Sequence, residues 1–578
     1  MVKKNNVIEV EFPKLGHFWL DNGLIGFFKL LEDQNKTQGQ CELLSENNTI
    51  KIKGSDSDIQ MLIEQTYEKL INNYYNLSTR KQKEDVLSYN FYYDSKKDKF
   101  FSFPKRKSVG IAEIIFNKAA RPTGSSIKWK TKVKREIQIN GKKVKRNRGI
   151  LPDEYSYLQK RMDDFLDENG LDVTTAGLLI DGPNAVRPNI TIKVAAKTSK
   201  GQCYLCGQEA AYVEEANQTI FPLITGSSGV LSFNSGGGKP ERVCWKCSLM
   251  GKFVPVTGFY MYQGDNIYAF LPYSSSLEKM RDTFELLNDA RTEDPNLLRN
   301  FIHPLGGYFQ HPFEAAFAFL YTLYEKVLCR KTKHQSEEDD YIPELDFIKY
   351  YDLVYNKSPV EFVIVHSKSE GNTFNCKMMW NFKETVYFFR LINELENRTK
   401  NKLKNSLALL VDYLQKQNEN KTLLRNRVLE RILKKQTILD LVEEHVFHSG
   451  ISYFKPLLDV LLVYEYLIKE EDDMFKEEQD AAVSLGRRIG TAVGKSENGK
   501  KGDLFALRKT RRMVDFLEQL NRLQFKLGND FIVPADIYEG KLSEKNFAEF
   551  KQFCMVAALN SYNAAKSEGK TKTAISTN

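Results

Sequence analysis

Four cysteines form two closely spaced pairs in this 578-residue chain, Cys203-Tyr-Leu-Cys206 and Cys244-Trp-Lys-Cys247, with 37 residues between them. Each C-x-x-C turn can direct two thiolates at one ion, and four sulfurs are a common ligand set for tetrahedral Zn²⁺. Four cysteines leave no open coordination position, so we expect structural zinc as the cofactor. Four unmetallated buried cysteines are the alternative. A thioredoxin-like redox pair fits less well, because neither pair lies in a clear strand–helix context.

The segment between the pairs contains the most glycine-rich stretch of the chain, residues 234–242. Glycine lets a backbone come close to a nucleic-acid groove, and neighbouring polar side chains can donate to base edges. The candidates for reading a DNA motif are Asn234, Ser235, Lys239 and Arg242. We therefore interpret residues 201–260 as a zinc knuckle with a DNA-reading loop. An equally weighted alternative is that the loop only connects the two halves of the knuckle.

Positive charge is concentrated in residues 105–148, which hold 15 Lys/Arg against two Glu, whereas the whole chain has a net charge of +9. Lysine alternates along residues 128–134, which predicts a strand with its cations on one face, and Asn140-Gly141 predicts a hairpin turn. Ten like charges repel unless they meet an anion, so contact with a nucleic-acid backbone is favoured over a solvated face. These cations are Lys128, Lys130, Lys132, Lys134, Arg135, Lys142, Lys143, Lys145, Arg146 and Arg148.

No set of residues typical of catalysis is evident, so we expect a protein that is not an enzyme. His303 and His311 could form a metal site with Glu314, but turn or core positions are a better interpretation of both histidines. His445 and His448 lie three residues apart in a helical pattern without an obvious carboxylate partner, and we interpret them as structural.

Composition predicts a cytoplasmic protein of several domains. Apolar residues make up 42% of the chain and aromatic residues 12%, which is ample for packed cores. No stretch approaches 18 uncharged apolar residues, so we expect no membrane segment. The first residues lack the apolar run of a signal peptide, and the other four cysteines are scattered singly, as in a reducing compartment.

Periodicity predicts an α+β fold: a mixed N-terminal body with an inserted four-cysteine zinc knuckle, followed by an all-helical C-terminal bundle. We expect residues 1–200 to form the first part of the body, with the basic ribbon, and residues 261–375 to complete it. A helix around Leu24–Leu31 would be capped by Asp21 or Asn22. Phe362–His366 is the last clear strand candidate.

From about Trp380 the pattern is helical. We expect a helical domain at 376–473 and a helical bundle at 474–578. In the bundle, Asp503 would cap one helix that reaches Leu527 and leaves four cations outside its apolar stripe: Arg508, Lys509, Arg511 and Arg512. Gly490–Ser496 is similar to a phosphate loop but has three intervening residues instead of four, in a helical pattern.

Two C-x-x-C pairs in the first half, the opening Trp19-Leu-Asp-Asn-Gly-Leu-Ile-Gly26 and the helical C-terminal part resemble the CXXC–CXXC large subunits of type I (I-A/I-B) CRISPR surveillance complexes, or Cascade. The resemblance implies a non-catalytic subunit at the 5′ end of the guide RNA. Such a subunit recognises a short motif beside the target in double-stranded DNA, promotes R-loop formation and holds the displaced strand. The implied protein partners are Cascade backbone and 5′-handle-binding subunits, small subunits and a helicase-nuclease.

By position, the four cysteines match the cysteine pairs of the family. Its motif-reading residues follow no sequence pattern, so their assignment to the glycine-rich loop is our inference. The basic ribbon would contact target duplex or guide, and residues 508–512 the displaced strand. Relatives with this layout can produce the C-terminal helices separately as small subunits, and an internal start at Met474 would give such a piece from residues 474–578.

Two other functions compete with this one. A zinc-dependent nucleic-acid-modifying enzyme would need an open metal position and a nearby general base, which four cysteines do not supply. A zinc-ribbon scaffold that binds proteins would use the basic segment only for solubility, and it would show no salt-dependent binding of nucleic acid.

Overall fold

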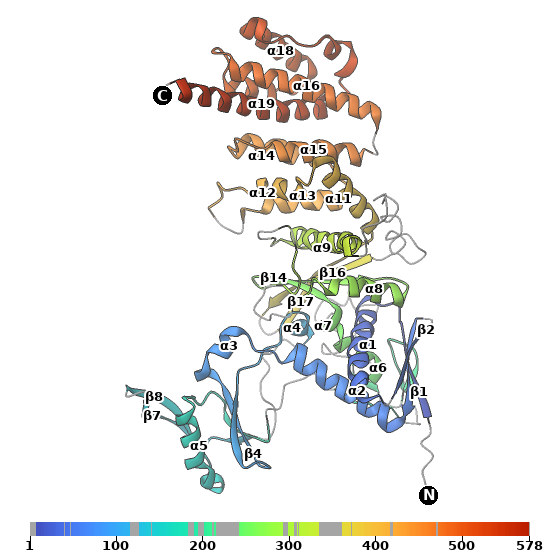
Figure 1. Cartoon of the computed structure of the whole chain (residues 1–578), viewed down its shortest axis with the longest axis vertical. Coiled ribbons are helices and arrows are strands. Elements are labelled where there is room, and N and C mark those ends of the chain that lie inside the picture. Colours follow the sequence, from blue (N-terminus) through green and yellow to red (C-terminus); the bar gives the residue numbers. More distant parts are fainter. Residues whose placement is uncertain are drawn as a thin grey trace. The chain divides into compact units, whose positions relative to one another are not determined.

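The protein is described by a computed structural model and has a mixed α+β fold, as the sequence predicts (Figure 1). It forms two compact units: Met1–Ile302 with Glu325–Lys383, and His303–Tyr324 with Glu384–Asn578. The structure describes residues 7–576 except 40, 47, 116–125, 140–141, 183–189, 195–200, 211–212, 216–241, 293–298, 304, 306–308, 310, 334–360, 371–372, 417–419 and 470–471.

The first unit opens with an antiparallel sheet of order β1-β3-β2 and two helices. The elements are β1 (Val7–Pro13), α1 (Phe18–Gln38), β2 (Glu42–Glu46), β3 (Thr49–Ser55) and α2 (Asp56–Leu70), which a π-helical turn at Ile71–Tyr75 extends. The expected first helix is present as α1, and its apolar residues Leu24, Phe27 and Leu31 are fully buried.

The N-cap of α1 differs from the prediction. His17 is the cap, and its side chain accepts from the backbone N–H groups of the first turn. Asp21 lies inside the helix and accepts from the backbone N–H of Leu15 at 2.8 Å, while Asn22 donates to the carbonyl of Pro272 at 2.7 Å. The prediction of Asp21 or Asn22 as the cap is therefore wrong, because both side chains bind other segments.

A second sheet has the order β5-β4-β9-β6, with β4 and β9 parallel. Its strands are β4 (Asn90–Asp94), β5 (Lys99–Phe103), β6 (Ser126–Lys128) and β9 (Gly177–Ile180). The amphipathic α5 (Ser156–Glu168) places Leu158, Met162 and Leu166 in the core of this part. The short helix α3 (Arg80–Glu84) precedes β4 in sequence, and the short helix α4 (Ile111–Ile115) lies between β5 and β6.

The hairpin of β7 (Thr131–Ile139) and β8 (Lys142–Ile150) is the basic ribbon predicted from the sequence. One detail is wrong: residues 128–134 do not form one strand. β6 ends at Lys128 and β7 begins at Thr131 because Trp129 turns aside to pack over Gly149 and donates to the carbonyl of Thr175 at 2.9 Å.

A four-stranded antiparallel sheet of order β14-β15-β16-β17 completes the strands of the first unit beyond the cysteine region. It contains β14 (Phe259–Gln263), β15 (Asn266–Tyr273), β16 (Glu361–Glu370) and β17 (Thr373–Phe382), and α8 (Leu277–Asn288) follows β15. The expectation that Phe362–His366 is the last strand is wrong. β17 pairs with β16 along its length, although its sequence lacks valine and isoleucine.

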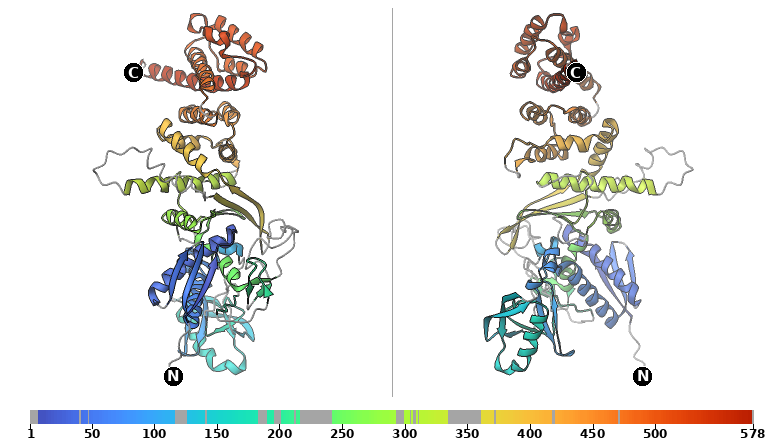
Figure 2. Two further views of the ribbon diagram at one scale, coloured as in Figure 1. Left: turned by 90° about the vertical axis from the view of Figure 1, so that its right-hand side faces the viewer. Right: turned by 60° about the vertical axis from the view of Figure 1, so that its left-hand side comes forward.

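The second unit is all-helical in its described residues (Figures 1 and 2). Its helices are α9 (Pro312–Lys333, up to Tyr324), α11 (Thr385–Thr399), α12 (Leu403–Leu409), α13 (Leu423–Leu433), α14 (Leu439–His448), α15 (Lys455–Ile468), α16 (Asp473–Lys495), α17 (Lys501–Arg508), α18 (Met513–Leu527) and α19 (Phe547–Ser576). The boundary between sheet and helical units falls after Lys383, and residues 303–324 join the helices rather than the predicted body.

Close packing of α16 on α19 explains the glycine spacing that is similar to a phosphate loop. A Cβ atom on Gly490 would lie 2.0 Å from the carbonyl oxygen of Ala558 in α19, and one on Gly494 would lie 2.7 Å from the Cβ of Ala565 in the same helix. Only glycine permits this approach of two helix backbones. The segment is therefore a helix contact and not a phosphate loop.

The predicted single helix from Asp503 to Leu527 is two helices, α17 and α18. Asp503 is not the cap: its side chain accepts from the backbone N–H of Lys500, the N-cap residue, at 2.8 Å. The chain leaves the helix at Thr510, whose buried hydroxyl donates to the carbonyl of Leu507 at 2.7 Å. No helix among the described residues is long and apolar enough to cross a bilayer.

Candidate metal centre and basic hairpin

The four predicted cysteines meet at one point in the first unit. Their sulfur atoms all lie within 4.8 Å of one another, and the Sγ atoms of Cys206 and Cys244 are 3.8 Å apart. Sulfurs bound tetrahedrally at 2.3 Å from one zinc ion lie about 3.8 Å apart. The four thiols are free rather than disulfide-bonded. The donor set and spacing therefore fit a closed four-sulfur metal site.

Short local elements position each sulfur. Cys203 follows β10 (Gly201–Gln202), which pairs with β11 (Glu209–Ala210), and the turn between them includes Gly207 with a φ of 70°. β12 (Val213–Glu215) pairs with β13 (Arg242–Cys244), and Cys244 caps α6 (Trp245–Lys252). Cys247 lies in the first turn of α6. Each pair thus occupies a tight turn, as the C-x-x-C spacing predicts.

Backbone donors and neighbouring thiols favour negative charge on one of these sulfurs, that of Cys203, and the same contacts raise the pKa of Cys244 and Cys247. The N–H of Cys244 donates to Cys203 Sγ at 3.2 Å, and the N–H of Cys247 donates to Cys244 Sγ at 3.5 Å. Hydrogen bonds from the thiols of Cys206, Cys244 and Cys247 lower the pKa of Cys203 far below its usual value. Metal binding requires the thiolate form, so this environment suits a cation.

The opening motif of the sequence holds the helix that carries the second cysteine pair. Trp19 is fully buried in α1 and donates from Nε1 to the carbonyl of Gly251 at 3.1 Å. A Cβ atom on Gly23 would lie 1.8 Å from the carbonyl oxygen of Met250. Two motifs more than 200 residues apart in sequence therefore meet in one contact. The sequence alone does not predict this contact, although the small residues of α1 are the signal for it.

Of the four residues predicted to read a DNA motif, only Arg242 lies within the described structure. It begins β13 and is exposed, and its carbonyl accepts from the N–H of Tyr204 at 2.9 Å. Asn234, Ser235 and Lys239 lie outside the described residues. The contact between Arg242 and Tyr204 joins the two C-x-x-C turns just beside the sulfurs.

Alternation along the hairpin places four of its lysines on one face and its three arginines on the other. The register pairs Lys132 with Gly149, Lys134 with Asn147 and Glu136 with Lys145. Directly paired residues share a face of the ribbon. One face, the lysine face, therefore carries Lys132, Lys134, Lys143 and Lys145. All four are exposed, and among the described carboxylates only Glu136 approaches one of them, Lys143, at 4.0 Å.

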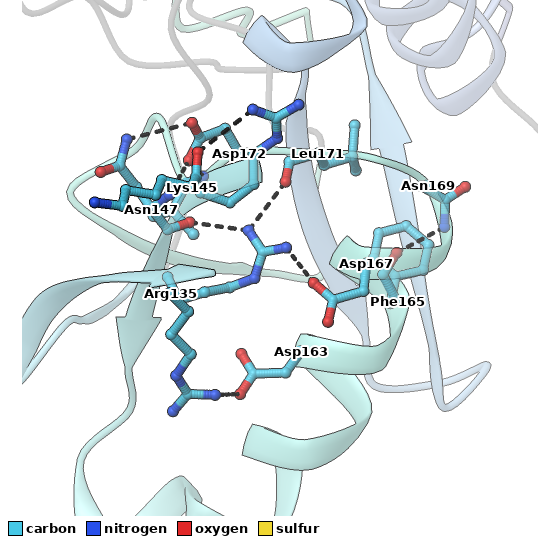
Figure 3. A network of polar contacts seen from close by, with 12 residues as sticks. Arg135, Lys145, Asn147, Asp163, Phe165, Asp167, Asn169, Leu171 and Asp172 are labelled. Atoms are coloured by element: carbon cyan, nitrogen blue, oxygen red, sulfur yellow. Dashed lines mark hydrogen bonds and ion pairs between the residues drawn. The ribbon is translucent and has the colours of Figure 1, made fainter. Parts of the chain in front are cut away.

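The opposite face, the arginine face, carries Arg135, Arg146 and Arg148. From this face, Arg135 points toward Asp163 of α5 (Figure 3). Arg135 pairs with Asp163 of α5 at 2.7 Å. Arg148 is 1% exposed, binds Asp167 of α5, and donates to the carbonyl of Leu171 at 3.1 Å. The prediction that Arg148 contacts nucleic acid is therefore wrong, and Arg135 is already paired with a protein carboxylate.

The remaining predicted backbone contacts lie at the margins of the hairpin. Lys128 is exposed at the end of β6, and Lys130 pairs with Asp153 at 3.0 Å. Arg146 is half-buried and donates to the carbonyl of Lys145 at 3.4 Å. The side chain of Lys142 lies outside the described residues.

In the second unit, the candidate histidines do not gather with other metal ligands among the described residues. Glu314 is fully buried and binds Arg425 at 2.6 Å, and it also accepts from the backbone N–H of His311 at 2.9 Å. His445 Nε2 lies 2.8 Å from the carbonyl of Leu409. Among the described residues, the four cysteines are the only His, Cys, Asp or Glu group close enough to share a metal.

The four cations predicted to face a displaced strand are not equivalent. Arg508 forms a two-pronged pair with Glu443 at 2.6 and 3.0 Å, so it contributes to the packing of the helical unit. Arg512 pairs with Asp515 at 2.7 Å. Lys509 and Arg511 are exposed.

No protein-family model and no curated protein matches this chain.

Proposed function

We propose that this protein is the non-catalytic, nucleic-acid-binding large subunit of a type I CRISPR surveillance complex. In this role it recognises a target-adjacent motif in duplex DNA, promotes R-loop formation and recruits a helicase-nuclease. The observation that carries the proposal is the lysine face of the β7–β8 hairpin. Four exposed lysines on one side of a ribbon, only one of them in an ion pair with a described carboxylate, are suited to phosphate contacts.

The cysteine cluster supports a binding role over a catalytic one. We propose that Zn²⁺ occupies it, held by Cys203, Cys206, Cys244 and Cys247. Four sulfur ligands would fill a tetrahedral ion and leave no position for water or substrate. Zinc here would fix α6 and the two turns that lie at the ends of the glycine-rich loop, and so prepare that loop to read duplex DNA.

The proposed identity is tested by co-purification. We would express the full chain with its flanking genes, purify it under low salt and sequence any bound RNA. Short RNAs of uniform length with a constant 5′ repeat-derived handle are expected. Purification without RNA and without stoichiometric partner proteins would remove the CRISPR assignment, and would leave the lysine face to be tested as a general nucleic-acid surface.

The lysine face has its own test. K132A/K134A should weaken binding of duplex DNA and lower the slope of log K against log salt by about 1.8, because each lost phosphate contact removes about 0.9. K81A/K83A is the matched control, because it removes the same charge from exposed positions on α3. An equal loss in both variants would mean that overall charge, and not the lysine face, drives binding.

A further inference from the structure

The four cysteines of the cluster differ in how far the fold shields them from solvent. Cys203, Cys244 and Cys247 are 1%, 3% and 1% exposed, whereas Cys206 is only half-buried. Tyr204, two residues before Cys206 in the same turn, is 44% exposed and leaves that side of the turn open. A small reagent dissolved in water therefore reaches Cys206 before the other three thiols.

A second cysteine lies close enough to Cys206 to form a disulfide with it. The Sγ atoms of Cys206 and Cys244 are 3.8 Å apart, although the two residues are 38 positions apart in sequence. Since the sulfurs of a disulfide are about 2.05 Å apart, these two need to approach by about 1.8 Å. Cys206 lies in a turn between two very short strands, β10 and β11, so a small shift of that turn is enough.

The other two cysteines are less suited to the reaction. Cys203 is buried, and its Sγ accepts from the backbone N–H of Cys244 at 3.2 Å. Cys247 is equally buried and lies in the first turn of α6, the helix that packs against α1. The shielded position of both sulfurs leaves Cys206 and Cys244 as the pair that an oxidant would join.

We propose that Cys206 is a site of oxidation by hydroperoxides, and that Cys244 converts the oxidised form into a disulfide that releases the bound metal. The thiolate is both the form of cysteine that binds metal and the form that reacts with peroxide. This inference rests on the zinc site of the proposed function and goes beyond it, because it concerns how the metal is lost.

The reaction takes two steps. The thiolate of Cys206 first attacks one oxygen of hydrogen peroxide: an S–O bond forms, the O–O bond breaks, and hydroxide leaves and takes a proton from solvent to become water. The thiolate of Cys244 then attacks the sulfur of this sulfenic acid: the S–S bond forms, the S–O bond breaks, and a second hydroxide leaves and is protonated. Each sulfur loses one electron, and the peroxide is reduced by two electrons to two molecules of water.

The disulfide would keep the knuckle closed after the metal has left. Two of the four sulfurs can no longer act as thiolate ligands, so the ion is released. Cys206 lies in the β10–β11 turn and Cys244 ends β13, so the new bond joins the same two turns that the ion would join. A crosslink also restricts the unfolded chain. We therefore expect zinc loss without unfolding, and recovery of the site when a dithiol reduces the disulfide.

The test treats the reduced, zinc-loaded full chain with hydrogen peroxide. A colorimetric chelator measures zinc release, dimedone traps the first sulfenic acid, and mass spectrometry of unreduced peptides identifies the disulfide. We expect dimedone on Cys206, and then a disulfide between Cys206 and Cys244 that forms in step with release of one zinc per chain. Circular dichroism should show a folded protein throughout, and dithiothreitol with added zinc should restore the starting state.

C376S is the control variant, because Cys376 is also half-buried but lies in β17, outside the cluster. It should release zinc at the wild-type rate, and slower release would overturn the proposal. First trapping at Cys203 or Cys247, a disulfide between Cys203 and Cys206, or zinc retained after oxidation of Cys206 would each overturn it as well.

The two proposals fail in different ways. A reduced protein that contains no zinc would remove the zinc site of the proposed function, and with it the release of metal. A disulfide between Cys206 and Cys244 in that zinc-free protein would still support Cys206 as the oxidation site. A zinc-loaded protein that peroxide leaves unchanged would overturn the present inference alone.

Discussion

Replacing Gly23 by alanine tests the contact between the opening motif and α6, the helix that carries Cys247 of the four-cysteine cluster. The new Cβ atom would lie 1.8 Å from the carbonyl oxygen of Met250 and 2.7 Å from its carbonyl carbon, where ordinary contacts begin at 3.4 Å. Both neighbours are backbone atoms of α6, so no side chain can rotate away. Either α1 or α6 must shift.

Two effects of opposite sign decide the magnitude. Alanine stabilises a helix interior over glycine by about 1 kcal/mol. Overpacking against a rigid neighbour costs about 1–3 kcal/mol, and the upper end applies because the overlap is with backbone. We therefore expect G23A to lower the free energy of unfolding by about 2 kcal/mol, which corresponds to a fall in melting temperature of about 4 °C.

The assay follows unfolding of the full chain by circular dichroism, together with release of zinc into a colorimetric chelator. In G23A, zinc should be released at a lower temperature than in wild type, because Cys244 caps α6 and Cys247 lies in its first turn. G502A is the control: Gly502 lies in α17, and a Cβ there would meet nothing within 4 Å. If G23A melts and retains zinc like wild type, α1 and α6 do not pack as closely as described.

Three further outcomes are expected. C203S should purify with less than one zinc per chain, as measured by elemental analysis, and should bind duplex DNA more weakly in anisotropy while the rest of the chain stays folded. Full zinc occupancy in C203S would contradict the four-sulfur site. Burial raises the pKa of Glu465 from 4.5 to about 7, so the folded state keeps a proton that the unfolded state loses, and stability should fall by about 3 kcal/mol as pH rises from 4.5 to 7. Urea unfolding should show this fall in wild type and not in E465Q. Expression of the untagged gene should yield a separate fragment of residues 474–578 in intact-mass spectrometry if Met474 is an internal start, and its absence would count against that hypothesis.

Features set by neighbours in sequence were predictable, and features set by tertiary contacts were not. The four cysteines meet as expected because each pair needs only a tight turn. The predicted N-cap of α1 was wrong because the side chains of Asp21 and Asn22 bind other segments of the chain. The partner of Asn22, the carbonyl of Pro272, lies 250 residues away in sequence. β17 was missed because its pairing with β16, rather than strand propensity, stabilises it.

The hairpin shows why charge counting alone assigned too many residues to nucleic acid. Composition gives the number of cations in residues 105–148 but not which side of the ribbon each occupies. The strand register shows which side of the ribbon each cation occupies, and it places Arg135 and Arg148 beside carboxylates of α5. Arginine suits that position because its planar group can bind a carboxylate and a backbone carbonyl together.

Lysine carries its charge at the end of a flexible chain and is strongly hydrated, so on the other face it stays in solvent and available to a mobile anion. Among its described residues, the helical unit shows the same contrast between paired and unpaired cations. Arg508 forms an ion pair with Glu443, whereas Arg487 and Arg488 of α16 line a cleft open to solvent. In both units, a cation is a candidate for nucleic-acid contact only after the protein's own carboxylates have been assigned. By that criterion, the lysine face of the hairpin is the surface to mutate first.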